Sequence, residues 1–187
     1  MISSRQVSVI IAFLFSTVFF CNEGQAKDSD LPSSFDSTAC VGFSFFKAKG
    51  IIFDSSSNLK LFNEVYGWLG VPYKWGGKSK AGADCSGFAS AVYKNVYNII
   101  VSGSAGDIYN ALKPVEKSEL REGDLVFFKI NNYYISHVGI YLSNNKFIHE
   151  TTYGSSVTIS DLNESYYQHY YFSAGRYQEK SGDTTKQ

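Results

Sequence analysis

The chain passes from a glycine-rich loop into a helical pattern at residues 82–88, which read Gly-Ala-Asp-Cys-Ser-Gly-Phe. Cys85 stands at the junction, and Phe88, Val92 and Val96 follow it at the spacing of one apolar helix face. A thiol in the first turn of a helix faces unpaired backbone N–H groups and the positive end of the helix dipole, which favour the thiolate. The same N–H groups can stabilise an oxyanion on a carbonyl group that the thiolate attacks. Cys85 is therefore a candidate nucleophile, and a small buried residue at a helix start is the alternative.

Helical patterns come first along the chain and strand patterns follow. Apolar residues at helical spacing from Leu59 to Leu69 predict a helix before the glycine-rich loop, with Ser57 or Asn58 as its cap. A short helix is expected near residues 108–112. Short β-branched or aromatic runs predict strands at residues 125–130, 135–142, 146–151, 157–160 and 170–177. This order predicts an α+β domain in which N-terminal helices, one with the nucleophile at its start, pack on an antiparallel β-sheet.

Charge and composition exclude some classes of function. Seventeen Lys and Arg balance seventeen Asp and Glu, and the sequence pI is about 6.8. No basic stripe runs along the sequence, so we expect no nucleic-acid partner. The 187 residues, of which 44% are hydrophobic and 18% charged, fit one globular domain rather than a disordered chain.

The beginning of the chain has the features of an export signal. A basic residue precedes an apolar run at residues 7–20, and these 14 residues are fewer than the roughly 20 that a membrane-spanning helix needs. Gly24 and Ala26 are small residues at the two positions that a signal peptidase recognises before its cleavage site, and polar residues follow. We expect residues 1–26 to be a cleaved signal peptide, which leaves no transmembrane span and a mature chain in the periplasm or outside the cell. A lipid anchor at Cys21 is the alternative.

The rest of the chain divides into three predicted parts. Residues 27–57 form a tether and N-terminal segment, in which a stretch rich in Ser and Asp, 27–39, precedes an apolar stretch, 40–53, that is expected to pack on the domain. Residues 58–178 form the catalytic domain, and residues 179–187 form a polar C-terminal tail. Three cysteines do not make a disulfide framework, and the surroundings of the candidate nucleophile indicate that its thiol is used.

Two of the three histidines lie on adjacent predicted strands. A two-residue turn between these strands would place His137 and His149 on opposite faces of the sheet. A three-residue loop at residues 143–145 instead pairs Gly139 with His149, and the histidines then share a face as diagonal neighbours about 7–8 Å apart. Such a loop needs a left-handed residue at its third position, which Asn145 can supply. The sequence permits this register without requiring it.

With both histidines on one face, the residues form a Cys–base–orienter set. His137 takes the proton of the Cys85 thiol, and His149 orients the His137 imidazole, as in papain-like enzymes. A zinc site formed by Cys85, His137 and His149 is the alternative. Because these residues lack paired Cys-x-x-Cys or His-x-x-x-His spacing, we expect neither a metal nor another cofactor.

Five fragments of the sequence occur in the order found in one known family. They are Gly-Val-Pro-Tyr-Lys-Trp-Gly-Gly at 70–77, Gly-Ala-Asp-Cys-Ser-Gly-Phe at 82–88, Gly-Asp-Leu-Val-Phe-Phe at 123–128, Ser-His-Val-Gly-Ile-Tyr at 136–141 and Phe-Ile-His at 147–149. On these fragments, residues 65–177 resemble the NlpC-type family of cell-wall endopeptidases. The resemblance implies a pared-down papain-like fold.

The resemblance also implies an activity and its residues. It implies a cysteine endopeptidase that hydrolyses amide bonds in peptidoglycan stem peptides, at a γ-D-glutamyl bond or a D,D-crosslink, through a thioester acyl-enzyme. Cys85 resembles the nucleophile, His137 the base and His149 the third polar residue. Tyr73 resembles a tyrosine that lines the site and helps to stabilise the oxyanion. An acyltransferase of the same fold and a non-catalytic wall-binding module are the alternatives.

Four further residues are implied in binding the stem peptide. The residues matched by Asp84 and Ser86 hold the free amino end of a short stem peptide in some members, and Trp75 and Ser104 occupy positions that contribute to the same pocket. The alternatives are a helix cap for Asp84 and a core position for Trp75.

Two departures from the family pattern affect the substrate site. Members often carry Leu-Pro-Arg-Thr-Ser after the second helix, whereas this chain has Val-Ser-Gly-Ser at residues 101–104. Glu150 follows His149 where a small residue is usual. We expect its charge to act on the acid–base balance of the site.

Overall fold

The computed structural model describes residues 37–130 and 133–178. Several sequence predictions concern residues outside these ranges. They are the signal peptide at 1–26 with the alternative lipid anchor at Cys21, most of the predicted tether, and the polar tail at 179–187. Within the described ranges, no helix combines the length and the apolar character that crossing a membrane requires.

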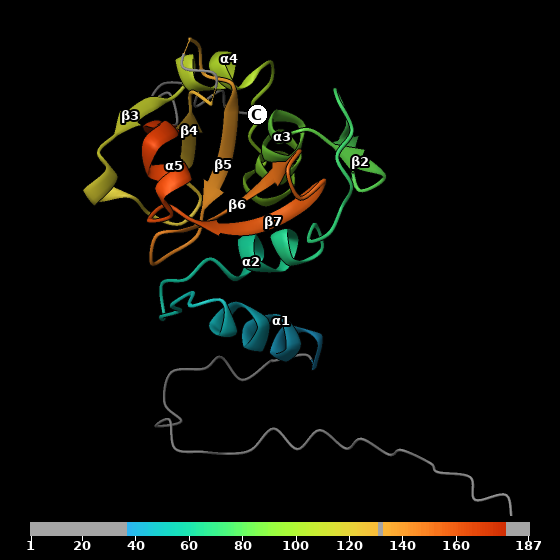
Figure 1. Cartoon of the computed structure of the whole chain (residues 1–187). Coiled ribbons are helices and arrows are strands. Elements are labelled where there is room, and N and C mark those ends of the chain that lie inside the picture. The colour runs from blue at the N-terminus through green and yellow to red at the C-terminus, as the bar shows by residue number, and fades with distance from the viewer. Residues whose placement is uncertain (1–36, 131–132, 179–187) are drawn as a thin grey trace, which may run out of the picture. The chain divides into compact units, whose positions relative to one another are not determined.

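The described elements form helices, a small hairpin and one larger sheet (Figure 1). The helices are α1 (Ser37–Ala48), α2 (Leu59–Tyr66), α3 (Cys85–Tyr97), α4 (Ala105–Asn110) and α5 (Ser165–Tyr170), with a 3-10 turn at Lys117–Glu119. β1 (Lys78–Ser79) pairs with β2 (Gly82–Ala83). The larger sheet has the order β3-β8-β4-β5-β6-β7 and contains β3 (Lys113–Val115), β4 (Leu125–Phe128), β5 (His137–Tyr141), β6 (Lys146–Thr151), β7 (Ser156–Asp161) and β8 (Tyr171–Arg176). All its neighbouring strands are antiparallel, which confirms the predicted α+β class.

Successive side chains of each strand point to opposite faces of the larger sheet. Both faces carry apolar side chains, and helices cover both. On one face, Phe127 of β4 belongs to the same core cluster as Phe88 of α3, and α3 packs against β5 and β6. On the other face, the ring of Phe128 lies 5.6 Å from that of Tyr167 in α5. The central strands of the sheet are therefore buried between α3 and α5, and α3 packs against β5 and β6 (Figure 1).

The predicted helix before the glycine-rich loop is present, with the predicted cap. The side chain of Asn58 accepts a hydrogen bond from the backbone N–H of Leu61 at 3.0 Å, and α2 begins at the next residue. The helix ends at Tyr66, earlier than the apolar pattern indicates. The chain continues through turns to Gly70, whose φ of 76° is a left-handed conformation that glycine adopts without steric strain.

Helix α1 differs from the predicted tether, because it begins at Ser37, inside the stretch at 27–39. The expectation that the following apolar stretch packs on the domain is confirmed. Phe46 and Ile51 are buried in the main core, and the Phe46 ring meets the edge of the Phe62 ring at 5.2 Å. The N-terminal segment is thus part of the folded unit from α1 onwards.

Strands β1, β2 and β3 and helix α5 lack a clear sequence signal. Strand β3 contains Pro114, which a strand tolerates at the edge of a sheet, and β3 is an edge strand of the larger sheet. The hairpin of β1 and β2 folds within the glycine-rich loop. Helix α5 is a single short helix of polar and aromatic residues, without an apolar repeat that would predict it.

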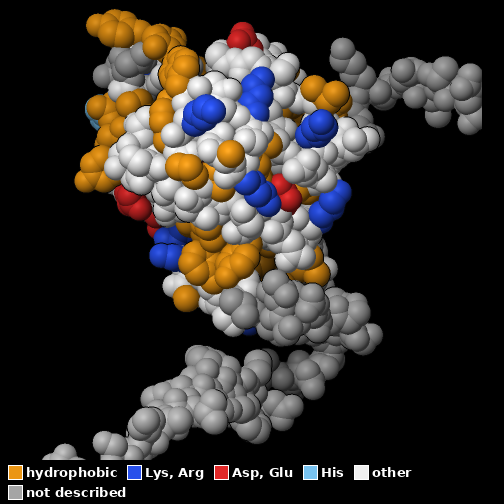
Figure 2. Space-filling view, turned by 90° about the vertical axis from the view of Figure 1, so that its right-hand side faces the viewer, with side chains coloured by type: hydrophobic (Ala, Val, Ile, Leu, Met, Phe, Trp, Pro, Cys, Tyr) orange, Lys and Arg blue, Asp and Glu red, His pale blue; other side chains and the backbone are white. Residues whose placement is uncertain are grey.

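The surface combines separated charges with exposed aromatic groups. Figure 2 shows a face on which hydrophobic side chains gather in patches between separated Lys and Arg side chains. Trp75 and Tyr153 are among the most exposed large hydrophobic residues, at 86% and 101%. Their loops are joined by a hydrogen bond from the Tyr73 N–H to the Ser155 carbonyl at 3.0 Å. Both side chains therefore extend into solvent from one pair of adjoining loops.

Candidate active site

The β5–β6 hairpin has the register that brings the two histidines together. Ile140 pairs with Ile148, and the Leu142 N–H donates to the Lys146 carbonyl at 2.9 Å, so the loop contains three residues. Asn145 has a φ of 61°, the left-handed conformation predicted for the third loop position. The three-residue alternative is thereby confirmed, and the same register places His149 opposite Gly139.

His137 and His149 form a hydrogen-bonded pair of imidazoles. Nε2 of His137 lies 2.7 Å from Nδ1 of His149, and the rings meet edge to face. Nε2 of His149 lies 3.1 Å from the Ser160 hydroxyl and 3.3 Å from the Tyr167 hydroxyl. The hydroxyls of Ser160 and Tyr167 are themselves hydrogen-bonded at 3.2 Å. His149 is thus held between His137 and two hydroxyl groups.

This chain of contacts is consistent with one set of tautomers. A base that accepts a proton at Nδ1 of His137 carries its hydrogen on Nε2 and donates it to His149. His149 then carries its own hydrogen on Nε2 and donates it to Ser160 or Tyr167. We infer these tautomers from the contacts. They leave Nδ1 of His137, which has no hydrogen-bond partner among the described residues, as an acceptor.

The Cys85 thiol lies where strands β5 and β6 separate. Their paired residues end at Ile140 and Ile148, and the same register would place Val138 opposite Glu150. The backbone N–H of Val138 instead interacts with the Cys85 thiol, as do the N–H groups of the first turn of α3. The first residue of α3 therefore lies beside the backbone that follows His137. This arrangement brings together the predicted nucleophile and the predicted base.

Burial controls the protonation of the site. It raises the pKa of the Cys85 thiol to about 11, and the Asp84 charge acts in the same direction, whereas the N–H groups of Val138, Ser86 and Cys85 itself act against it. Burial lowers the pKa of His137 to about 4. The first-turn N–H groups do favour the thiolate, as predicted, but burial outweighs them. At neutral pH the resting site contains a thiol and an unprotonated His137.

His149 is also uncharged at neutral pH. Its pKa lies well below the usual value, because the ring is buried and because a charge on His137 would repel a second one. The zinc alternative does not fit this geometry, since Nε2 of His137 and Nδ1 of His149 bond to each other instead of converging on a common point. Among the residues that the structure describes, no three His, Cys, Asp or Glu side chains are grouped to hold a metal ion.

Asp84 is the cap of α3 and also ties the glycine-rich loop to the site. Its Oδ1 accepts hydrogen bonds from the Gly87 N–H at 2.7 Å and the Ser86 hydroxyl at 3.0 Å, and its Oδ2 accepts one from the Gly76 N–H at 2.8 Å. Asp84 is therefore a helix cap, and its contact with a substrate stays a prediction. Gly87 allows this close packing, because a Cβ atom there would collide with the Gly77 carbonyl.

Tyr73 lies close to the nucleophile. The residue forms a parallel bridge with Ala83, two residues before Cys85. Burial, together with the charges of Asp84, Cys85 and Glu150, raises the pKa of its hydroxyl group. Tyr73 therefore stays protonated at neutral pH and can donate a hydrogen bond near the thiol.

Trp75 and Ser104 have different environments. Trp75 is 86% exposed, so the alternative of a core position is wrong. Ser104 caps α4, and its hydroxyl lies 2.7 Å from the Asp107 carboxylate in a capping box. This cap explains why α4 starts at Ala105, before the predicted helix near residues 108–112. Contact of Trp75 or Ser104 with a substrate stays a prediction.

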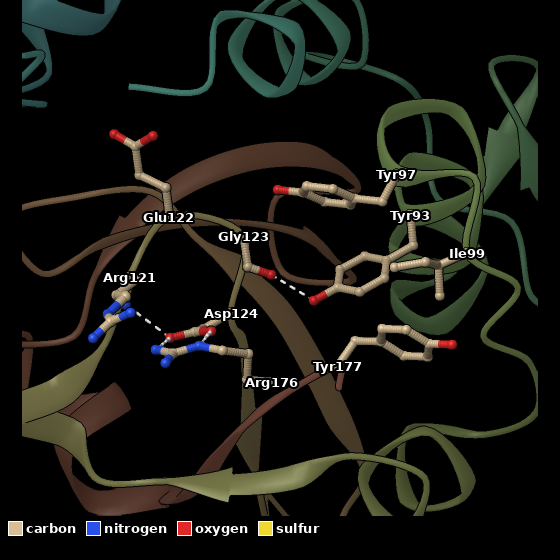
Figure 3. A pocket seen from close by; sticks show the side chains of 9 residues that line it. All are labelled: Tyr93, Tyr97, Ile99, Arg121, Glu122, Gly123, Asp124, Arg176 and Tyr177. Atoms are coloured by element: carbon tan, nitrogen blue, oxygen red, sulfur yellow. Dashed lines mark hydrogen bonds and ion pairs between the residues drawn. The ribbon is translucent and has the colours of Figure 1, made fainter. Parts of the chain in front are cut away.

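A cavity of about 350 Å³ lies at the other end of α3 (Figure 3). Tyr93, Tyr97 and Arg176 are among its lining residues, and none of the predicted site residues is. The Tyr93 hydroxyl donates to the Gly123 carbonyl at 2.6 Å, and the Arg176 guanidinium forms a two-bond ion pair with the buried Asp124. These polar groups already bond to each other, so the cavity is part of the packing between α3 and the sheet.

The fold and the site together define a class of protein. It is a small papain-like α+β domain in which a thiol at the start of a helix lies beside the strand of an antiparallel sheet that begins with His137, and His137 is hydrogen-bonded to His149. The NlpC/P60 family matches residues 70–176, more than half of the chain. The chain therefore belongs to the NlpC/P60 family, as the resemblance predicted.

Individual relatives agree with this assignment. The chain is 40% identical over 116 residues to a probable endopeptidase NlpC homolog of Haemophilus influenzae, a match that covers 62% of this chain and 59% of the relative. It is 39% identical over 118 residues to murein DD-endopeptidase MepH of Escherichia coli, a match that covers 61% of this chain and 44% of MepH. It is 38% identical over 117 residues to the Escherichia coli protein named murein DD-endopeptidase MepS/murein LD-carboxypeptidase, which covers 63% and 61%. The chain thus spans about three fifths or less of the length of these relatives.

Solved structures share the fold. A Bacillus cereus protein of the NlpC/P60 family superposes with a TM-score of 0.59 at 35% identity, over 63% of this chain and 39% of that one. The NlpC/P60 domain of the peptidoglycan hydrolase SagA superposes with a TM-score of 0.56 at 29% identity, over 65% and 99%. The fold of the described domain is thus that of NlpC/P60 domains.

Proposed function

We propose that the protein is an exported cysteine endopeptidase that hydrolyses peptidoglycan stem peptides. The observation that carries this proposal is the Cys85 thiol beside the start of β5, where His137 is bonded to His149. The names of the relatives support the substrate class, since MepH and MepS are named murein endopeptidases. The activity, the substrate and the catalytic roles below are parts of this proposal.

The reaction proceeds in two steps at Cys85. Nδ1 of His137 accepts the thiol proton while the sulfur attacks the carbonyl carbon of the scissile amide, and the Tyr73 hydroxyl and first-turn N–H groups stabilise the oxyanion. Protonated His137 then gives the proton to the leaving amine, and a thioester remains. Water, deprotonated by His137, attacks the thioester, and the thiol recovers its proton as the acid product leaves. His149 keeps His137 in the required tautomer throughout.

The bond that is cleaved has two candidates. A D,D-crosslink is favoured by MepH and MepS, both of which are named DD-endopeptidases. A γ-D-glutamyl bond beside a free amino terminus is favoured by the arrangement of Asp84, Ser86 and Tyr73 near the thiol. Both bonds are amides, so the proposed chemistry is the same for both.

Export is part of the proposal and rests on the sequence. Residues 1–26 have the features of a signal peptide, and Cys21 offers a lipid anchor as the alternative. The proposed location is the periplasm or the outside of the cell, with the catalytic domain at residues 58–178 and α1 packed on it.

Digestion of solubilised peptidoglycan by the chain without residues 1–26 tests the proposal. Mass spectrometry should find new fragments with the unsubstituted protein and none with Cys85→Ala, whose unfolding temperature should be unchanged within a few degrees. The fragment masses identify the bond. A conjugate in place of two hydrolysis fragments would indicate the acyltransferase alternative. Equal activity of both proteins would refute the cysteine mechanism.

A further inference from the structure

Glu150 is a buried carboxylate without a partner. The residue is 1% exposed, and neither of its carboxylate oxygens has a hydrogen-bond partner among the described residues. It lies in β6 directly after His149. Buried carboxylates are normally hydrogen-bonded or paired with a cation, because removal from water destabilises an unpaired charge strongly. We therefore expect a ligand to bind the Glu150 carboxylate.

The sheet places Glu150 on the side of the nucleophile. Its neighbour Ile148, two residues away and therefore on the same face, belongs to the core that includes α3. If the β5–β6 pairing continued beyond Ile140 and Ile148, Glu150 would pair with Val138. The N–H of Val138 instead interacts with the Cys85 thiol. Glu150 therefore lies beyond the last β5–β6 pair, on the face of the sheet that α3 covers.

The Tyr73 loop closes the other side of the same space. Glu150 pairs with Val157 in β7, and the N–H of Val157 donates to the Val71 carbonyl at 2.9 Å. Pro72 forms a bridge with Ser156, next to Val157. The loop that carries Tyr73 thus runs along β7 beside the partner of Glu150, and it then reaches Asp84 through the bridge between Tyr73 and Ala83. The Tyr73 hydroxyl is close enough to Glu150, Asp84 and Cys85 for all three to raise its pKa.

Two carboxylates therefore lie near the thiol, and they differ in how they are bonded. Asp84 accepts three hydrogen bonds from groups of its own loop and helix, whereas Glu150 accepts none in the described structure. Burial and the Asp84 charge raise the pKa of Glu150 to about 7. The charge of Asp84 acts on Glu150, and the charges of Glu150 and Asp84 both act on Tyr73, so none of these groups adds a positive charge. A ligand cation with several N–H donors would satisfy both the charge and the empty acceptors.

We propose that Glu150 adds a second carboxylate to the amine-binding subsite expected at Asp84, and that Glu150 receives a primary ammonium group of the substrate there. The proposal deepens the peptidase function and rests on it. Glu150 is in this view a specificity-determining residue rather than a participant in bond cleavage. A stem peptide offers two such groups, the free amino terminus and the side-chain amine of its diamino acid, and the experiment separates them.

Binding to the inactive Cys85→Ala protein tests the subsite without turnover. Isothermal titration compares one synthetic stem peptide in three forms: with both amines free, with only the amino terminus acetylated, and with only the side-chain amine acetylated. Adding Glu150→Gln to this protein should weaken binding of the unmodified peptide roughly ten- to hundredfold. The same substitution should leave unchanged the affinity for the peptide whose recognised amine is acetylated. Glu116→Gln, at an exposed carboxylate, is the matched control and should change neither affinity.

Proton release gives a second readout that a structural role would not produce. At pH 6.5 much of Glu150 is protonated, so binding of an ammonium group should release a proton, seen as a heat that depends on the ionisation enthalpy of the buffer. This dependence should disappear with Glu150→Gln. If that variant does not fold, Glu150→Ala takes its place.

The outcomes separate the subsite from the peptidase function. Equal affinity of the Glu150→Gln and Glu150 proteins for the unmodified peptide would overturn the subsite, as would an equal loss of affinity for all three peptides. If the protein with Cys85 intact cleaves no wall peptide while the preference for an amine persists in binding, the peptidase function fails and the ammonium subsite stands.

Discussion

His149 is held on both sides by groups that fix its hydrogen positions. Nδ1 bonds to His137, and Nε2 lies near the hydroxyls of Ser160 and Tyr167. A base needs the correct tautomer as well as the correct position, and loss of the tautomer reduces catalysis even when the geometry is kept. In the proposed mechanism, Ser160 and Tyr167 are therefore positioning residues that act on the thiol only through the two histidines.

Removal of both hydroxyls tests this role. The double variant Ser160→Ala/Tyr167→Phe should lower kcat/KM on wall peptides by roughly ten- to hundredfold, because orienting groups of this kind commonly contribute that much. Each single variant should lose less, since one hydroxyl remains. The pH–rate profiles should also differ in their acidic limbs, because His149 loses its partner. Tyr166→Phe, at an adjacent tyrosine that is 49% exposed, is the control. An unchanged pH profile in the double variant would contradict the positioning role.

The sequence indicated the candidate catalytic residues, but not the residues that hold them in place. Cys85, His137 and His149 could be found because each is a rare residue type beside a recognisable pattern. Tyr167 is one of fourteen tyrosines, and its place depends on the docking of α5 on the far face of the sheet, which no local pattern encodes. The helix dipole at Cys85 was also predicted, but its balance against burial depends on the tertiary structure.

For helices and strands, the sequence predictions agree with the structure where a single turn or cap residue determines the local backbone geometry. Asn145 has the left-handed backbone that the three-residue loop needs, and Asn58 caps α2, so both predictions followed from one residue's chemistry. Helix α1 was not predicted, because it is held mainly by contacts of aromatic side chains with distant residues. Strand β3 depends in the same way on pairing with β8, which lies far along the chain.

The contribution of α1 to stability can be measured at Phe46. The side chain is 1% exposed and contacts the rings of Phe53 and Phe62. Phe46→Ala should lower the free energy of unfolding by about 3–5 kcal/mol in urea denaturation, the usual effect of truncating a buried phenylalanine. Peptidase activity at low temperature should persist, since α1 contributes no group to the site.

Lys47→Ala, at an exposed position of the same helix, is the control and should change stability little. If Phe46→Ala leaves the denaturation midpoint unchanged, α1 does not contribute to the stability of the domain, and its packing in the structure would be wrong.

For the whole molecule, a few buried groups should dominate the dependence of stability on pH, because basic and acidic residues balance. Burial keeps His137 and His149 neutral, and their pKa values in the folded protein are below that of an unfolded histidine. The unfolded chain therefore binds more protons below about pH 6.5, and stability falls as the pH decreases toward 4. The effect of Glu150 on stability has the opposite dependence on pH. Its pKa is raised in the folded protein, so the folded form binds its proton more tightly, and stability falls as the pH rises from about 4.5 through 7.

Glu150→Gln separates the two trends. At pH 8 the substitution should raise the free energy of unfolding by roughly 1–3 kcal/mol, because a buried charge is removed. At pH 4.5 it should have little effect, and the loss of stability on the acidic side, which belongs to the histidines, should remain. Thermal unfolding between pH 4 and 8 measures both. The same change at pH 8 and pH 4.5 would contradict the assignment of the alkaline loss to Glu150.

The position of β8 has a consequence for the time at which the molecule can fold. Although β8 is the last described strand, it lies inside the sheet between β3 and β4, and its Arg176 pairs with the buried Asp124. While the ribosome is still making residues 171–176, β4 has an unpaired edge and Asp124 has no cation. The sheet can therefore be completed only after nearly the whole domain has been synthesised. Such an order suits a chain that crosses a membrane before it folds.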